Sequence, residues 1–336
     1  MKRIISFLLA LALVFSLAAC AAPAEKADDG KIQIVTTLFP YYDFARAIVG
    51  DRADVTLLLS PGREAHSFEP TPLDAVTISE SDVFLYNGGE GEYWVDSMLD
   101  AAGENIAVVA RMMDYVDALD EEYVEGMQGA DDHAHGSHDD HDHDEHDDHD
   151  HEDEHDSDEV EYDEHIWTSP KNAVVLCRAV CGAICETDPA NEDFYRANCD
   201  DYCAQIEALD ARFADLCASA PRKLLIFADR FPMLYFCREF GLDYRAAFHG
   251  CSGDTEPSLA TIKYLIDKVE DENIPVVYTI DFDTKKVAAV VSECTGAAVD
   301  TLYSMQTVSR ADFDAGETYL TLMERNYEAL RKGLSE

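Results

Sequence analysis

The sequence has few basic residues. Its 336 residues include 25 lysines and arginines against 69 aspartates and glutamates, which gives a formal net charge of −44 at pH 7. Nucleic acids and anionic lipid surfaces both attract proteins through positive charge, so this shortage argues against direct binding to either. The charge balance favours cations as partners.

Long apolar runs are also scarce. One stretch, residues 4–19, is apolar, follows the basic start Met1-Lys2-Arg3 and ends in Leu17-Ala18-Ala19-Cys20. The pattern predicts a secretion signal at residues 1–20, because the run is shorter than the roughly 20 residues that span a bilayer. Its ending resembles the lipobox of bacterial lipoproteins, so we expect Cys20 to carry a lipid, with residues 21–30 as a tether. An ordinary cleaved signal is the alternative.

The ten cysteines do not indicate a disulfide framework. Nine follow Cys20, an odd number, so at least one is either free or paired to another chain. Five of them recur at four-residue spacing on predicted helices, where we expect them to pack as small apolar side chains. A site for a soft metal is the alternative for this group, which comprises Cys177, Cys181, Cys185, Cys199 and Cys203.

Residues 131–159 carry nine histidines among aspartates and glutamates, with no lysine or arginine. Imidazole and carboxylate groups are ligands for zinc, copper and nickel, and the segment has too few apolar residues to form a core. We predict a disordered, low-affinity metal-binding loop at about 128–160 and call residues 131–159 the histidine tract. A solvated acidic spacer is the alternative. The histidines are His133, His135, His138, His141, His143, His146, His149, His151 and His155.

Predicted strands and helices alternate on both sides of the tract, which indicates parallel α/β layering. A long helix from Pro189 to about residue 218 would span about 45 Å at 1.5 Å per residue and could bridge two lobes. The strands are expected at 32–37, 54–59, 83–86, 223–228, 244–248 and 276–280, and the shorter helices at 41–49, 71–79, 94–101, 231–240, 258–270, 287–295 and 319–334.

Two segments resemble the metal-ligand motifs of the zinc and manganese substrate-binding proteins of ABC transporters. Asp188-Pro189 is similar to the start of that family's backbone helix, and residues 319–326 are similar to its C-terminal helix. The two motifs are Pro61-Gly62-Arg63-Glu64-Ala65-His66-Ser67-Phe68-Glu69-Pro70-Thr71-Pro72 and Asp163-Glu164-His165-Ile166-Trp167-Thr168-Ser169-Pro170.

The resemblance implies a fold and a function. The fold would have two α/β lobes with parallel sheets at 31–170 and 221–336, joined through 171–220 by one long rigid helix, with a metal cleft between the lobes. The function would be high-affinity capture of Zn²⁺ outside the cytoplasm and delivery to an ABC permease. We expect a monomer that is lipid-anchored to the outer face of the bacterial cell membrane and catalyses no reaction.

His66 and His165 are the predicted metal ligands, because each lies in one of the two motifs. The family's usual third and fourth donors are missing, since Ala228 and Met305 stand at those positions. We predict Asp229 and His249 as replacements, because zinc with only two protein ligands would bind weakly. Their alternative roles are a helix cap near Phe231 for Asp229 and an exposed loop residue for His249.

Three other functions remain open. Manganese, which prefers oxygen ligands, could be the ion instead of zinc. The chain could be an extracellular metal buffer that uses the histidine tract as its main site. A metal-dependent hydrolase with Glu64 or Glu164 as its base is disfavoured, because neither residue lies in a His-Glu-x-x-His pattern.

Overall fold

The computed structural model of the chain describes residues 30–63, 68–128, 161–250, 252, 256–282 and 284–335. Cys20, His66 and the histidine tract lie outside these ranges, and their predicted roles stay predictions. In the described part of the chain, no helix is both long enough and apolar enough to cross a membrane.

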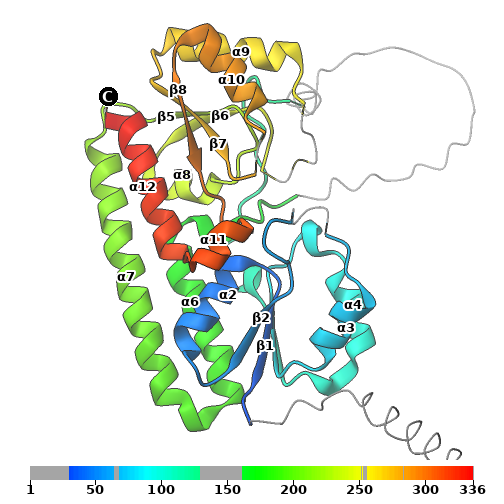
Figure 1. The fold of residues 1–336 in the computed structure, drawn as a ribbon. Helices are drawn as coiled ribbons and strands as arrows, with labels where there is room; N and C mark the ends of the chain where they lie inside the picture. Colours follow the sequence, from blue (N-terminus) through cyan, green and yellow to red (C-terminus); the bar gives the residue numbers. More distant parts are fainter. Residues whose placement is uncertain are drawn as a thin grey trace, which may run out of the picture. The chain divides into compact units, whose positions relative to one another are not determined.

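The first lobe is built on a parallel sheet with the strand order β2-β1-β3-β4 (Figure 1). Its inner strands β1 and β3 are almost entirely buried, as expected where helices cover both faces of a parallel sheet. Its elements in chain order are β1 (Gln33–Thr36), α2 (Phe39–Val49), β2 (Asp54–Leu57), α3 (Pro72–Ser79), β3 (Val83–Tyr86), α4 (Val95–Ala102) and β4 (Val108–Arg111).

The second lobe repeats this topology, with the strand order β6-β5-β7-β8 and all pairs parallel. Its elements in chain order are β5 (Leu224–Phe227), α8 (Leu234–Phe240), β6 (Asp243–Ala246), α9 (Leu259–Asp271), β7 (Val276–Ile280), α10 (Lys286–Thr295), β8 (Ala298–Leu302), α11 (Arg310–Ala315) and α12 (Tyr319–Ser335).

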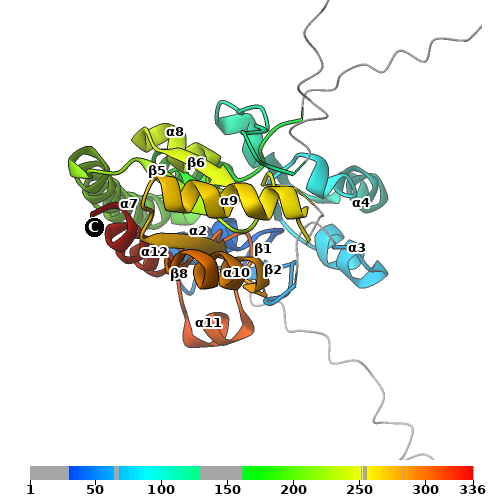
Figure 2. The ribbon, with the colours of Figure 1, turned by 90° about the horizontal axis from the view of Figure 1, so that it is seen from above.

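The two faces of the second sheet are covered by different helices. Val277 packs in a small core with residues of α9 and α10, which lie side by side in the view from above (Figure 2). The next residue, Tyr278, points to the opposite face and donates a hydrogen bond to the carbonyl of Ala329 on α12 at 3.3 Å. Alternation along β7 therefore separates the two helical layers.

Two long helices connect the lobes. α6 (Pro170–Thr187) and α7 (Glu192–Ser219) form a hairpin, and α7 packs against α2 of the first lobe and against α8 and α12 of the second (Figure 1). The start of α6 is defined by Ser169, whose hydroxyl accepts the backbone N–H of Asn172 at 3.1 Å, followed by Pro170 at the first helical position. The predicted long helix is confirmed.

The predicted α/β class with two parallel sheets is also confirmed, and every predicted strand and helix is present. Strands β4 and β8 and helix α11 were not predicted. β4 is four residues long and overlaps the apolar run 106–110, and so short a run does not distinguish a strand from a helix.

A buried carboxylate joins three helices of this framework. Asp43 on α2 accepts the hydroxyl of Tyr202 on α7 at 2.5 Å and the backbone N–H of Tyr319 at the start of α12 at 2.9 Å. Burial raises the pKa of Asp43 even though both hydrogen bonds act to lower it. The carboxylate therefore ties α2 to the bridging helix and to the C-terminal helix.

Replacing Asp43 by alanine should lower the free energy of unfolding by about 2–4 kcal/mol, because it leaves a buried tyrosine hydroxyl and a backbone N–H without an acceptor. Urea denaturation measures this change. Glu207→Ala, at an exposed position of α7, is the control and should shift stability by less than about 0.5 kcal/mol. Equal stability of the two variants would show that the Asp43 contacts carry no net energy.

Candidate metal centre

The chain segments on either side of the histidine tract pair with each other. Asp120 and Tyr162 form an isolated antiparallel bridge, flanked by hydrogen bonds from Glu121 N–H to the carbonyl of Glu161 at 2.8 Å and from Asp163 N–H to the carbonyl of Leu119 at 2.9 Å. This pairing brings Glu121 close to Asp163 and His165, which are distant from it in sequence.

His165 is held in a buried position, with 1% of its surface exposed. Its Nδ1 lies 3.1 Å from Oδ1 of Asp163, and the same oxygen accepts the backbone N–H of His165 at 2.7 Å. The edge of its ring contacts Trp167, whose indole N–H donates to the carbonyl of Ser304 at 2.7 Å. A carboxylate on one ring nitrogen is the arrangement that orients a metal-binding histidine, with Nε2 then serving as the ligand.

His249 and Glu121 form a second pair. Nδ1 of His249 lies 3.8 Å from Oε2 of Glu121, and neither atom has a hydrogen-bond partner among the described residues although both are buried. The other oxygen of Glu121 accepts the backbone N–H of Gly250 at 3.1 Å. Two ligands of one tetrahedral zinc ion each lie about 2.0–2.2 Å from it, so their nitrogen and oxygen atoms are about 3.3–3.5 Å apart. The separation of His249 and Glu121 is slightly longer than that, so the two side chains would move closer together to share an ion.

The loop that carries His249 contacts His165 directly. A Cβ atom placed on Gly250 would lie 3.2 Å from Cε1 and Nδ1 of the His165 ring and 2.9 Å from the carbonyl of Phe231, so only glycine fits there without a shift. His165, His249 and Glu121 therefore gather around Gly250.

Residues 119–128 dock this group onto the second lobe. The hydroxyl of Tyr235 on α8 accepts the N–H of Leu119 at 3.0 Å and donates to the carbonyl of Asp163 at 2.8 Å. Further along, the N–H of Gln128 donates to the carbonyl of Ala247 at 2.9 Å, and Glu122 pairs with Arg238. A segment from the first half of the chain thus supplies Glu121 to a site beside β6.

The charges at the site act on one another. For His165, burial lowers the pKa of the imidazole, but Asp163, followed by Glu121 and Glu164, outweighs it, so the pKa is raised. For His249, burial again lowers the pKa and Glu121 outweighs it, with a raised pKa as the result. The pKa of Glu121 is lowered, because the contact with His249 outweighs the effect of its own burial. The carboxylates around His165 and His249 therefore favour positive charge at this group of side chains.

Comparison with known proteins identifies the family. The profile of the family described as "Zinc-uptake complex component A periplasmic" (ZnuA) matches residues 34–333. The chain belongs to this family. The high-affinity zinc uptake system protein ZnuA of Bacillus subtilis is 31% identical over 324 residues, which cover 94% of this chain and 93% of that protein. The family resemblance inferred from the two motifs is confirmed.

Two further comparisons concern one streptococcal protein. Zinc-binding lipoprotein AdcA of Streptococcus pneumoniae serotype 4 is 29% identical over 333 residues, which cover 99% of this chain and 61% of AdcA. The crystal structure of the Zn(II)-bound ZnuA-like domain of that species' AdcA matches with a TM-score of 0.71 and 25% identity, over 91% of this chain and 100% of the domain. The chain thus spans 61% of the length of this relative.

The family pattern leads us to expect donors at two places in the second lobe, after β5 and after β8. Ala228 and Met305, which replace the donors expected from the family pattern, are both buried, with 2% and 0% of their surfaces exposed. Neither offers an oxygen or nitrogen from its side chain. Glu121 was not predicted from the sequence as a donor, although it lies in the same group as two predicted histidines.

Asp229 makes contacts within the second lobe. Its Oδ2 accepts the backbone N–H of Ile280 at 3.0 Å, at the end of β7, and its Oδ1 accepts the N–H of Arg230 at 2.8 Å. The alternative of a helix cap is wrong, because α8 begins at Leu234 after Met233 and no side chain caps it. Asp229 as a metal ligand stays a prediction, and its observed contacts favour a structural role.

Glu164, the neighbour of His165, faces a different space. Its Oε1 accepts the N–H of Gly91 at 2.7 Å, and it lines a pocket with Glu92, Phe68 and Trp94. Burial raises the pKa of Glu164. Burial also raises the pKa of Glu92, to about 7. Asp163, and not Glu164, is therefore the carboxylate that contacts the imidazole of His165.

The raised pKa values can be measured directly. In a variant with the nine tract histidines replaced by serine, three histidines remain, and proton NMR should show His165 and His249 titrating above the ordinary value of about 6.5. Glu121→Gln should lower the pKa of His249 because it removes the facing carboxylate, whereas Glu122→Gln should leave it unchanged. Titration of both imidazoles at or below about 6.5 would contradict the described geometry.

Proposed function

We propose that this chain captures Zn²⁺ outside the cytoplasm and delivers it to the permease of an ABC importer, as a monomer lipid-anchored through Cys20 to the outer face of the cell membrane. The observation that carries the proposal is the buried pair of Glu121 and His249 beside His165. It sets one imidazole against one carboxylate, next to a second imidazole that Asp163 orients. The zinc-related names of its relatives support the same assignment.

His66 completes the proposed ligand set. Of the twelve histidines in the chain, nine lie in the tract, and the other three are His66, His165 and His249. Three imidazoles and the Glu121 carboxylate would make a four-coordinate site, which is the number that zinc takes with protein ligands. The nitrogen-rich set disfavours manganese, which prefers oxygen donors.

The charges of the proposed site balance. Glu121 and the Asp163 carboxylate behind His165 together offset the two positive charges of the ion, so a buried Zn²⁺ would leave no net charge uncompensated. In the empty protein the same carboxylates favour protonated imidazoles. Zinc must displace those protons, so affinity should fall as the pH drops.

The histidine tract would act as a weak collector. Its many imidazole and carboxylate groups raise the local concentration of metal near the tight site and hold ions until that site takes one. We place residues 31–170 and 221–336 on the two sides of the metal cleft, with 171–220 as the connection. No catalytic step is part of the proposal.

Competitive titration with a zinc chelator tests the ligand set. The nine tract histidines are replaced by serine, which preserves the chain length and the pairing of residues 119–121 with 161–163. This protein should bind one Zn²⁺ tightly, and His165→Ala or His249→Ala should weaken binding more than about 100-fold, since losing even an outer partner costs about 10–100-fold.

Glu121→Gln is the decisive variant, because no family motif points to this residue. It should weaken zinc binding at least about 10-fold, while Glu122→Gln, the neighbouring change in a surface ion pair, should have no effect. Equal affinity of the two variants would remove Glu121 from the site. If the protein without tract histidines binds no ion tightly while the unmodified chain binds several weakly, the chain is an extracellular buffer.

A further inference from the structure

Cysteines from two helices face one another inside the α6–α7 hairpin. Cys177 and Cys181 lie on α6, and Cys199 and Cys203 lie on α7, each pair one helical turn apart and all at most 3% exposed. Cys177 precedes Ala190 by as many residues as Cys203 follows it, and the same holds for Cys181 and Cys199. The hairpin therefore places Cys177 opposite Cys203, and Cys181 opposite Cys199, at matching positions along the two helices.

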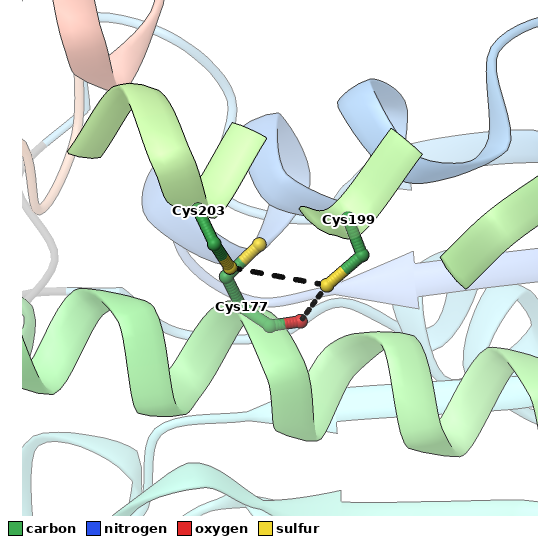
Figure 3. A group of neighbouring side chains, drawn as sticks. All are labelled: Cys177, Cys199 and Cys203. Atoms are coloured by element: carbon green, nitrogen blue, oxygen red, sulfur yellow. Dashed lines mark hydrogen bonds between the residues drawn. The ribbon is translucent and has the colours of Figure 1, made fainter. Parts of the chain in front are cut away.

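Three of the sulfur atoms converge. The Sγ atoms of Cys177, Cys199 and Cys203 all lie within 4.8 Å of one another, and Figure 3 shows them directed into the space between the helices. The Sγ atoms of Cys199 and Cys203 are 3.9 Å apart. A metal ion bound by thiolates at about 2.3 Å holds its sulfur atoms about 3.8–4.0 Å apart. The spacing of Cys199 and Cys203 is close to that of a coordination shell, and the other two sulfur separations are at most 4.8 Å.

Filling of the core alone does not account for this arrangement. Cys217 and Cys237 are equally buried, with 1% and 2% of their surfaces exposed, yet neither belongs to a group of three potential ligands. Small apolar residues would fill the hairpin as well as thiols do. Cys177, Cys199 and Cys203 differ from them because their three Sγ atoms lie within 4.8 Å of one another.

We propose that Cys177, Cys199 and Cys203 bind one soft cation of the Zn²⁺ or Cu(I) class through their thiolates, separately from the candidate metal centre. All three donors are sulfur, which selects soft metals over Mn²⁺, Mg²⁺ and Ca²⁺. The bound ion would join α6 to α7, and α7 packs on both lobes. Its role would be to stabilise the connection between them.

Two thiols of the cluster donate to backbone carbonyls in the empty site. The thiol of Cys199 donates to the carbonyl of Cys177 at 3.8 Å, and the thiol of Cys203 donates to the carbonyl of Val174 at 3.9 Å. The guanidinium of Arg178 also lies close enough to interact with Cys199 and Cys203. A metal would displace the thiol protons of Cys177, Cys199 and Cys203. Three thiolates and Zn²⁺ would leave one negative charge beside Arg178.

Titration of the full chain with Cd²⁺ under reducing conditions tests the proposal. Cadmium bound to thiolate has an ultraviolet charge-transfer band that imidazole and carboxylate ligands do not produce, so metal in the histidine tract does not interfere. We expect the band to saturate at one equivalent, to disappear in Cys199→Ser and to persist in Cys217→Ser. Competition with Zn²⁺ and with Cu(I) then distinguishes the two candidate ions.

Alkylation of the unmodified chain provides a test that does not depend on a folded variant. Bound metal should slow the alkylation of Cys177, Cys199 and Cys203 that follows local opening of the hairpin, as identified by mass spectrometry, and should leave the labelling of exposed Cys294 unchanged. Absence of protection, a band that survives in Cys199→Ser, or a disulfide within the cluster in protein isolated without reductant would each overturn the proposal. None of these outcomes bears on zinc capture by His165 and His249.

Discussion

The pairing of residues 119–121 with residues 161–163 is the contact on which the candidate metal centre depends. It closes the chain on either side of the histidine tract and sets Glu121, Asp163 and His165 next to one another. Because Tyr235 binds both strands of this pairing, the same contact also attaches it to the second lobe. The described segments on either side of the tract therefore lie beside the site to which the tract would supply metal.

In the proposed site, donors come from elements other than those that the family pattern leads us to expect. The strand ends that would supply donors in the second lobe carry the buried side chains of Ala228 and Met305. His249 approaches instead from the loop after β6, and Glu121 approaches from a segment of the first half of the chain. The proposed set has four donors and enough negative charge from Glu121 and Asp163 to balance the ion.

The two proposed metal sites are separated by the chemistry of their ligands. Imidazole and carboxylate groups lie beside β6, whereas the thiols are enclosed between α6 and α7, where water does not reach them. A borderline ion such as Zn²⁺ can bind to either kind of group, but a softer ion is retained by sulfur. The helix pair that connects the lobes would thus carry a structural ion, and the centre beside β6 would exchange its ion.

The sequence by itself determined the alternation of strands and helices, the long helix α7, the family and the placement of His165, because apolar periodicity and local motifs encode these features over a few neighbouring residues. Only the tertiary structure decided which carboxylates meet the histidines. Glu121 joins the site through backbone pairing across the whole tract, and Asp229 is directed to the end of β7 by a hydrogen bond to Ile280. Backbone hydrogen bonds between distant segments leave no local pattern of side chains, so no reading of neighbouring residues reveals them.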